Sequence, residues 1–138
     1  MMDGVICTAL KKIKNPKGDI FHAMKETDVG YERFGEAYFT SICHGEIKGW
    51  KKHYKMTLNL IVPCGSVLFY IHDETTGKTD KVLVNSDNYY RLTISPGLWV
   101  AFEGIGDSLN LILNIASLEH DPLESLSKPI ETFNLDEI

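Results

Sequence analysis

The sequence predicts an all-β protein, and more narrowly a jelly-roll β-barrel. The first observation is that residues 31–116 divide into about seven short runs rich in β-branched, aromatic and aliphatic residues. The second is that Gly, Pro, Asn and Asp separate these runs at regular intervals, as is typical of sandwiches and barrels. The third is that helical candidates are few: one turn within residues 120–133 and a weak candidate near the N-terminus. Such a barrel has an interior that can hold one small ligand.

Each expected strand begins and ends where the composition changes. Alternation of apolar and polar residues is clearest in MTLNLIV, which stops at Pro63, and in SVLFYIHD, which runs into the turn-rich ETTGKTD loop. The Pro96-Gly97 pair and the Gly104–Asp107 segment mark turns on either side of LWVAFEG. The expected strands, in chain order, are 36–43, 56–62, 66–73, 81–85, 89–94, 98–104 and 109–116.

Length and composition predict one domain, residues 1–138, with a substantial core. Hydrophobic residues make up 43% and charged residues 24%, which is ordinary for a globular protein. The net charge of −5 argues against a nucleic-acid partner, which requires a basic face. No apolar run is long enough to span a membrane. Asp3 precedes the first short apolar run, so the N-terminus does not resemble a signal peptide.

The three cysteines are an odd number and show no C-x-x-C spacing. This usage fits a reduced, cytoplasmic setting, in which Cys7, Cys43 and Cys64 are expected to be small core residues.

The stretch KGWKKHYK is the most informative for function. On a strand, alternation places Lys51, His53 and Lys55 on one face and Lys48 on the other. Three cationic or titratable groups on one face suit an anion such as a diphosphate. The same pattern is also typical of a solvated edge strand, whose lysines prevent pairing with another chain. Composition alone leaves both interpretations open.

The sequence predicts no metal and no other cofactor. Metal-binding barrels of this shape need an H-x-H pair and a third histidine after the Pro-Gly turn. Here the H-x-H place reads Lys51-Lys52-His53, and the third place holds Val100. There is also no G-x-S-x-G nucleophile motif and no Gly-rich phosphate loop.

Several polar residues interrupt the apolar strands and are candidates to face a ligand. They are Tyr38, Asn59, Tyr70, Arg91 and Asn114, and the clustered aromatic residue Trp99 is a further candidate. Buried polar groups need partners, and in a barrel with a cavity the ligand can supply them. The alternative is that these side chains point to solvent on alternate positions of each strand.

Three stretches resemble the dTDP-4-dehydrorhamnose 3,5-epimerase family: GEIKGWKKH, LNLIVPCGSVLFYIHD and NYYRLTISPGLWVAF. The family pattern is G-x-x-R-G-x-H, then G-x-V-x-D-V-x-x-D, then I-P-P-G-F-A-H-G-F. The resemblance spans residues 17–124 and implies a cupin-like barrel. GWKKHYKMTLNLIVPCG, PGLWVAFEG and NIASLEHDP look closer to a shorter, sugar 3,4-ketoisomerase-like branch from surface-polysaccharide gene clusters.

At several positions this sequence differs from the functional residues of the family that it resembles. Its phosphate-contacting arginine falls on Lys48, which keeps the charge and loses the bidentate fork. Its base histidine falls on Lys51, although His53 lies two residues on and can replace it. Its second histidine falls on Val100 and its acid tyrosine falls near Asn114. The acidic residue that orients the base has no clear counterpart.

The resemblance implies a metal-free epimerase or ketoisomerase that acts on a nucleotide-linked 4-keto (deoxy)hexose in surface polysaccharide biosynthesis, as a cytoplasmic homodimer. The expected catalytic residues are Lys51 and His53, with Tyr38 or Tyr90 as the acid. The expected substrate-binding residues are Lys48, Lys55, Asn59, Arg91, Trp99 and Asn114. Two alternatives stay open: a sugar-nucleotide-binding barrel that has lost its base, and an interaction domain with an empty barrel.

Overall fold

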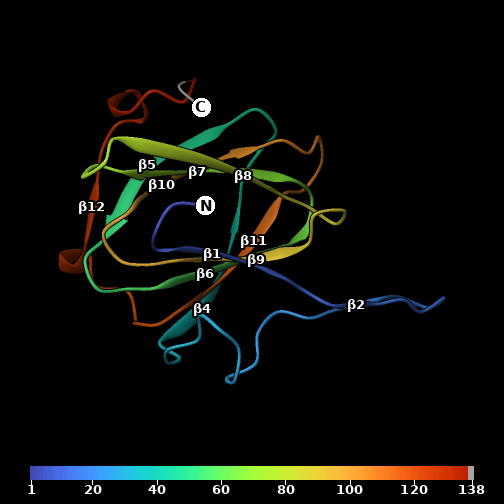
Figure 1. Ribbon diagram of the computed structural model, residues 1–138. Helices are drawn as coiled ribbons and strands as arrows, with labels where there is room; N and C mark the ends of the chain where they lie inside the picture. The colour runs from blue at the N-terminus through green and yellow to red at the C-terminus, as the bar shows by residue number, and fades with distance from the viewer. Residues whose placement is uncertain (137–138) are drawn as a thin grey trace.

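Two five-stranded antiparallel sheets face each other in the computed structural model, which describes residues 1–136 (Figure 1). The first sheet has the order β1 (Val5–Ala9), β9 (Tyr90–Ile94), β6 (Leu58–Cys64), β11 (Leu111–Ala116), β4 (Glu36–Ser41). The second has the order β12 (Ser125–Ser127), β5 (Ile47–His53), β10 (Trp99–Gly104), β7 (Val67–Asp73), β8 (Lys78–Val84). From β4 to β7 the chain crosses between the sheets at every step, and the predicted all-β jelly roll is confirmed.

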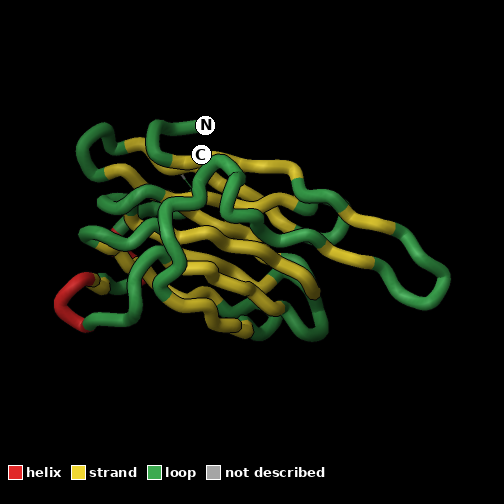
Figure 2. The backbone as a smooth tube through the Cα atoms, turned by 90° about the horizontal axis from the view of Figure 1, so that it is seen from below, coloured by secondary structure: helices red, strands yellow, loops and turns green. Residues whose placement is uncertain are grey.

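A short hairpin projects from the barrel (Figures 1 and 2). It is formed by β2 (Lys12–Ile13) and β3 (Ile20–Phe21), and Ile13, Ile20 and Phe21 are exposed on it. Two 3₁₀ turns complete the described elements, η1 (Pro122–Glu124) and η2 (Ile130–Thr132). No helix among residues 1–136 is long and apolar enough to cross a membrane.

The main core lies between the sheets and follows the two-residue period of the strands. Every second residue of β6 and of β7 points inward. Leu58 and Leu60 from the first sheet and Phe69 and Ile71 from the second are therefore buried in one cluster between the sheets. A second, smaller cluster lies on the outer face of the second sheet. There the C-terminal segment, residues 128–136, covers Trp50 and Trp99 with Ile130, Phe133 and Leu135.

The structure confirms one of three local predictions and contradicts two. The weak N-terminal helix candidate was wrong, because the β-branched run Val5–Ala9 pairs along its length with β9. The single helical turn before Pro129 is confirmed as η1, and strand β12 follows it. The cysteines were expected in the core, yet Cys7, Cys43 and Cys64 are all exposed, on strand residues or loops that face away from the packed interior.

Candidate functional site

A cavity of about 280 Å³ lies between the two sheets, and we call it the interior cavity. Its apolar wall consists of Leu58, Leu60, Phe69, Val100, Phe102 and Ile112. Its polar lining consists of Tyr38, Thr40, Lys48, Gly49, Lys51, His53 and Asn114. The volume is near the lower end of the range for small-molecule pockets, roughly 300–1,000 Å³. The space therefore suits a ligand, or part of a ligand, about the size of one six-membered ring.

A β-bulge in β5 brings both lysines to this cavity. Val100 pairs with Lys51 and Phe102 pairs with Lys48, so two steps along β10 match three along β5. Without the extra residue, Lys48 and Lys51 would point to opposite faces, as simple alternation predicts. Gly49 occupies the bulge, where an added Cβ would lie 3.3 Å from the backbone nitrogen of Ile130. A side chain at position 49 would therefore press on the backbone at Ile130, which would have to move by a few tenths of an ångström.

The strongest polar contact at the interior cavity joins His53 to Glu124. His53 Nδ1 lies 2.6 Å from Glu124 Oε1, and both side chains are largely buried. A carboxylate only accepts hydrogen bonds, so Nδ1 carries the hydrogen in the neutral imidazole. Nε2 is then unprotonated and is the nitrogen that can take a proton.

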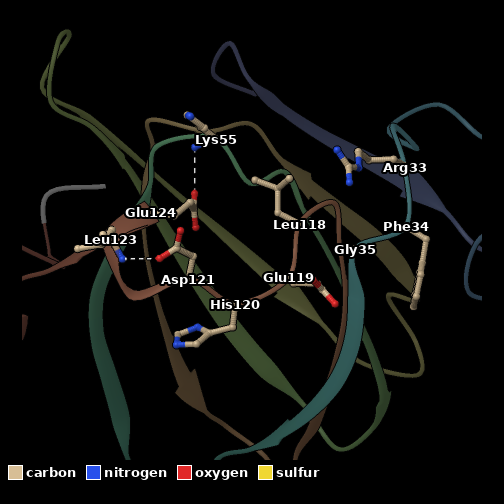
Figure 3. A pocket seen from close by; sticks show the side chains of 10 residues that line it. All are labelled: Arg33, Phe34, Gly35, Lys55, Leu118, Glu119, His120, Asp121, Leu123 and Glu124. Atoms are coloured by element: carbon tan, nitrogen blue, oxygen red, sulfur yellow. Dashed lines mark hydrogen bonds between the residues drawn. The ribbon is translucent and has the colours of Figure 1, made fainter.

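Glu124 is fixed from two sides (Figure 3). Its other oxygen, Oε2, accepts hydrogen bonds at 2.9 Å from the backbone amides of Lys55 and Met56. Burial alone would raise the pKa of Glu124, but the hydrogen bonds from His53 and the two amides outweigh burial and hold that pKa below its usual value. The carboxyl group therefore stays ionised beside His53.

The local sequence explains how Glu124 reaches this position. Asp121 caps the η1 turn by accepting a hydrogen bond from the Leu123 amide, and Pro122 supplies the fixed φ that begins such a turn. Directly after the turn, Ser125 pairs with His53 in the β12–β5 ladder. Glu124 is therefore held one residue away from the strand partner of the histidine that it contacts.

The two cavity lysines differ in their partners. Lys48 Nζ donates a hydrogen bond to the backbone oxygen of Ser41 at 2.8 Å and lies 5.9 Å from the centre of the Phe102 ring. Lys51 has no hydrogen-bond or ion-pair partner within residues 1–136. Its ammonium group is therefore free to bind a molecule in the interior cavity.

Tyr38 and Asn114 face β5 from the opposite sheet. They are register partners on β4 and β11, and Asn114 Nδ2 donates a hydrogen bond to Tyr38 Oη at 3.1 Å. The interior cavity therefore brings together the sequence candidates Tyr38, Lys48, Lys51, His53 and Asn114.

Three other candidates, Arg91, Asn59 and Trp99, lie outside the interior cavity. Arg91 is fully buried and holds the loop at residues 23–29, where it bonds to the Ala23 and Val29 carbonyls and to Asp28. The Asn59 side chain is bonded to Gly30 and Thr93. Trp99 is buried in the outer cluster, with its indole nitrogen bonded to Glu74. The sequence suggested these residues as substrate contacts, with solvent exposure as the alternative for Asn59 and Arg91, whereas the structure pairs all three side chains with protein groups.

Lys55 and Tyr90 are also placed apart from the interior cavity. Tyr90 is a half-buried residue at the start of β9 and does not line the cavity. Lys55 lies just past β5 and lines an outer cavity of about 780 Å³ (Figure 3). The outer cavity is bounded by Arg33, Phe34, Gly35, Lys55, Leu118, Glu119, His120, Asp121, Leu123 and Glu124. Glu124 thus forms part of the wall between the two cavities.

No group of three His, Cys, Asp or Glu side chains within the described range 1–136 is arranged to hold a metal ion. The side chains at the interior cavity provide an imidazole–carboxylate pair, a phenol and two ammonium groups.

The chain is similar in fold and sequence to several known proteins. A dTDP sugar isomerase from Desulfovibrio desulfuricans G20 superimposes with a TM-score of 0.90, is 29% identical, and the match covers 94% of this chain and 87% of that one. The chain is a structural homologue of dTDP-sugar isomerases. No model of a known protein family matches it.

More distant relatives share the fold or the sequence. The dTDP-4-dehydrorhamnose 3,5-epimerase of Sulfolobus tokodaii has a TM-score of 0.86 at 18% identity, covering 99% of this chain and 83% of its own. The sugar 3,4-ketoisomerase QdtA of Thermoanaerobacterium thermosaccharolyticum, in complex with TDP, has a TM-score of 0.78 at 20% identity, covering 91% and 89%. These two matches establish the common fold. In sequence, the Bacillus subtilis (strain 168) spore coat polysaccharide biosynthesis protein SpsL is 24% identical over 127 residues, 88% of this chain and 84% of that protein.

Sequence reasoning missed Glu124. It lies 71 residues from His53 in the chain, so no local spacing links the two. The one available signal was Asp121-Pro122, which predicts a capped turn and so an ordered position for the residue that ends it.

Proposed function

We propose that this protein is a metal-free nucleotide-sugar isomerase, either an epimerase or a 3,4-ketoisomerase, that acts by proton abstraction next to a ketone. The observation that carries the proposal is the His53–Glu124 pair, with the free Nε2 on the side chain that lines a cavity of sugar-ring size. A histidine oriented by a buried carboxylate is the standard means of making a neutral general base near pH 7.

The other residues of the interior cavity provide the remaining groups for this chemistry. When His53 Nε2 takes the proton α to the keto group, the C–H electrons move into the carbonyl and leave a negative charge on its oxygen. Lys51, with no other partner within residues 1–136, is placed to stabilise that charge. Tyr38 faces β5 from the other sheet and is the proposed acid. Delivery of a proton to the same carbon from the opposite side inverts that carbon. Moving the ketone needs two transfers: the hydroxyl proton on C3 passes to the oxygen on C4, and His53 returns its proton to C4, so that the carbonyl forms at C3.

The proposed substrate is a nucleotide-linked 4-keto (deoxy)hexose used for a surface polysaccharide in the cytoplasm. The relatives that carry TDP or dTDP in their names, and SpsL with its polysaccharide role, support this class. Only the sugar fits the interior cavity, so the diphosphate is proposed to lie at its mouth near Lys48.

We further propose a homodimer. A two-stranded hairpin is marginal on its own in water, and the hairpin at residues 12–21 projects from the barrel with exposed Ile13, Ile20 and Phe21. A second copy that covers these side chains would stabilise the hairpin.

Solvent deuterium incorporation tests the activity. The protein is incubated in D₂O with a panel of TDP-linked 4-keto-6-deoxy sugars, and NMR follows C3, C4 and C5. With wild-type protein we expect deuterium at C3 or C5 if it is an epimerase, and a 3-keto product with deuterium at C4 if it is a ketoisomerase. We expect neither with His53→Asn. Incorporation at C5, or at C3 without movement of the ketone, identifies an epimerase, whereas appearance of a 3-keto sugar identifies a ketoisomerase.

A non-catalytic sugar-nucleotide-binding barrel is the second candidate, because Lys51 occupies the place of the base histidine of the epimerases that the sequence resembles. If no sugar exchanges and calorimetry still detects binding, the enzyme proposal fails and the binding function stands.

A further inference from the structure

A short chain of hydrogen bonds controls the direction of the Tyr38 hydroxyl. It begins at the backbone amide of Asn59, which donates to Asn114 Oδ1 at 3.2 Å. A backbone N–H can only donate, so the oxygen of the Asn114 amide must face it. The NH₂ end of the same side chain must then point the other way, and Asn114 is almost fully buried, with 3% of its surface exposed.

The NH₂ end of Asn114 meets the phenol. Asn114 Nδ2 donates to Tyr38 Oη at 3.1 Å, so the phenol oxygen accepts this bond. An amide NH₂ has no acceptor capacity, so the Tyr38 hydrogen cannot be directed back to Asn114. No other acceptor for that hydrogen is present within residues 1–136, and both side chains line the interior cavity. The hydroxyl hydrogen is thus available to a molecule in the cavity.

We infer that Asn114 is a positioning residue that makes Tyr38 a hydrogen and proton donor toward the bound sugar. The inference rests on the proposed function and assigns a role to a residue that the sequence suggested only as a substrate contact. It also accounts for a departure from the epimerase pattern, in which the acid tyrosine falls near Asn114. In this chain the tyrosine stands at the directly paired position of the neighbouring strand, Tyr38 on β4.

The substitution Asn114→Asp tests this inference because it replaces only the NH₂ group by an oxygen. One carboxylate oxygen still accepts from the Asn59 amide, and the other accepts the Tyr38 hydrogen and withdraws it from the cavity. We expect kcat to fall by about 10²-fold, as for loss of a general acid, with KM changed much less. Tyr38→Phe should give a loss of similar size, and the double variant should be no worse than either single variant.

Two results would overturn the inference: an N114D enzyme with wild-type kcat, or losses from N114D and Tyr38→Phe that multiply. If N114D does not fold, replacing Tyr38 by its fluorinated analogue 3-fluorotyrosine tests whether Tyr38 donates a proton. The fluorinated phenol is more acidic, so a proton donor shifts the pH profile of kcat to lower pH. An unshifted profile contradicts the inference. Failure of the wild-type protein to exchange deuterium contradicts the proposed function instead.

Discussion

At the scale of single residues, the His53–Glu124 contact decides which histidine nitrogen can act. Glutamine at position 124 would still offer an oxygen to the Lys55 and Met56 amides, so its NH₂ would face His53 Nδ1. Nδ1 would then accept, Nε2 would carry the hydrogen, and the base would be lost. For Glu124→Gln we expect deuterium exchange to slow by about 10³-fold or more.

Glu119→Gln is the matched control, because Glu119 is exposed on the outer cavity and does not contact His53. It should exchange deuterium at the wild-type rate. If the Glu124→Gln protein still exchanged deuterium at the wild-type rate, Glu124 would not be needed to orient His53 as the base.

Glu124 also links stability to pH. Its pKa is lower in the folded protein than its ordinary value of 4.5, so its contribution to stability is complete above that value and disappears as the pH falls through the lowered pKa. The difference in Tm between wild type and Glu124→Gln should therefore be constant near neutral pH and shrink below about pH 4.5. Differential scanning calorimetry across pH 3–7 measures this, and a pH-independent difference would contradict the assignment of the shift to Glu124.

At the scale of elements, the C-terminal segment holds the outer cluster together. Phe133 stacks on His72 with ring centroids 3.9 Å apart and meets the Trp50 ring at 5.2 Å. Burial also lowers the pKa of His72, so its ring is neutral in this stack at neutral pH. Phe133→Ala should reduce the free energy of unfolding by roughly 1–3 kcal/mol, since Phe133 is only half-buried.

Phe34→Ala is the control for Phe133→Ala, because Phe34 is 59% exposed. Its free energy of unfolding in urea should stay within about 0.5 kcal/mol of wild type. Equal losses for the two variants would show that residues 128–136 add nothing to the fold.

The strands of the barrel were predictable where one face is more buried than the other, since this imposes a two-residue period such as the one along β11. The bulge at Gly49 was not predictable, since an added residue leaves no mark on composition while it reverses the face of Lys48. The partners of Asn59 and Arg91 were equally hidden, because they lie far along the chain: Gly30 and Thr93 for Asn59, and the loop at residues 23–29 for Arg91. The periodicity of a strand predicts which side chains are buried, but it does not predict which groups those side chains contact.

At the scale of the whole molecule, the projecting hairpin is the feature that separates a monomer from a dimer. Replacing Ile13 and Ile20 by Ser removes apolar surface that the proposed partner copy would cover, and neither residue belongs to the main core. We expect wild type to be dimeric and the double variant monomeric by light scattering. A wild-type monomer at the concentrations used for the assay would contradict the homodimer.

The position of Glu124 near the end of the chain has a consequence for synthesis. All strands that enclose the interior cavity precede residue 117, and Glu124 with the segment that covers Trp50 comes after them. A chain interrupted between these two points has every cavity-lining residue and no carboxylate beside His53. Such a chain would also lack strand β12 and the segment that packs on Trp50 and Trp99, so the orientation of His53 and the cover of the second sheet are completed together, by the same last stretch of residues.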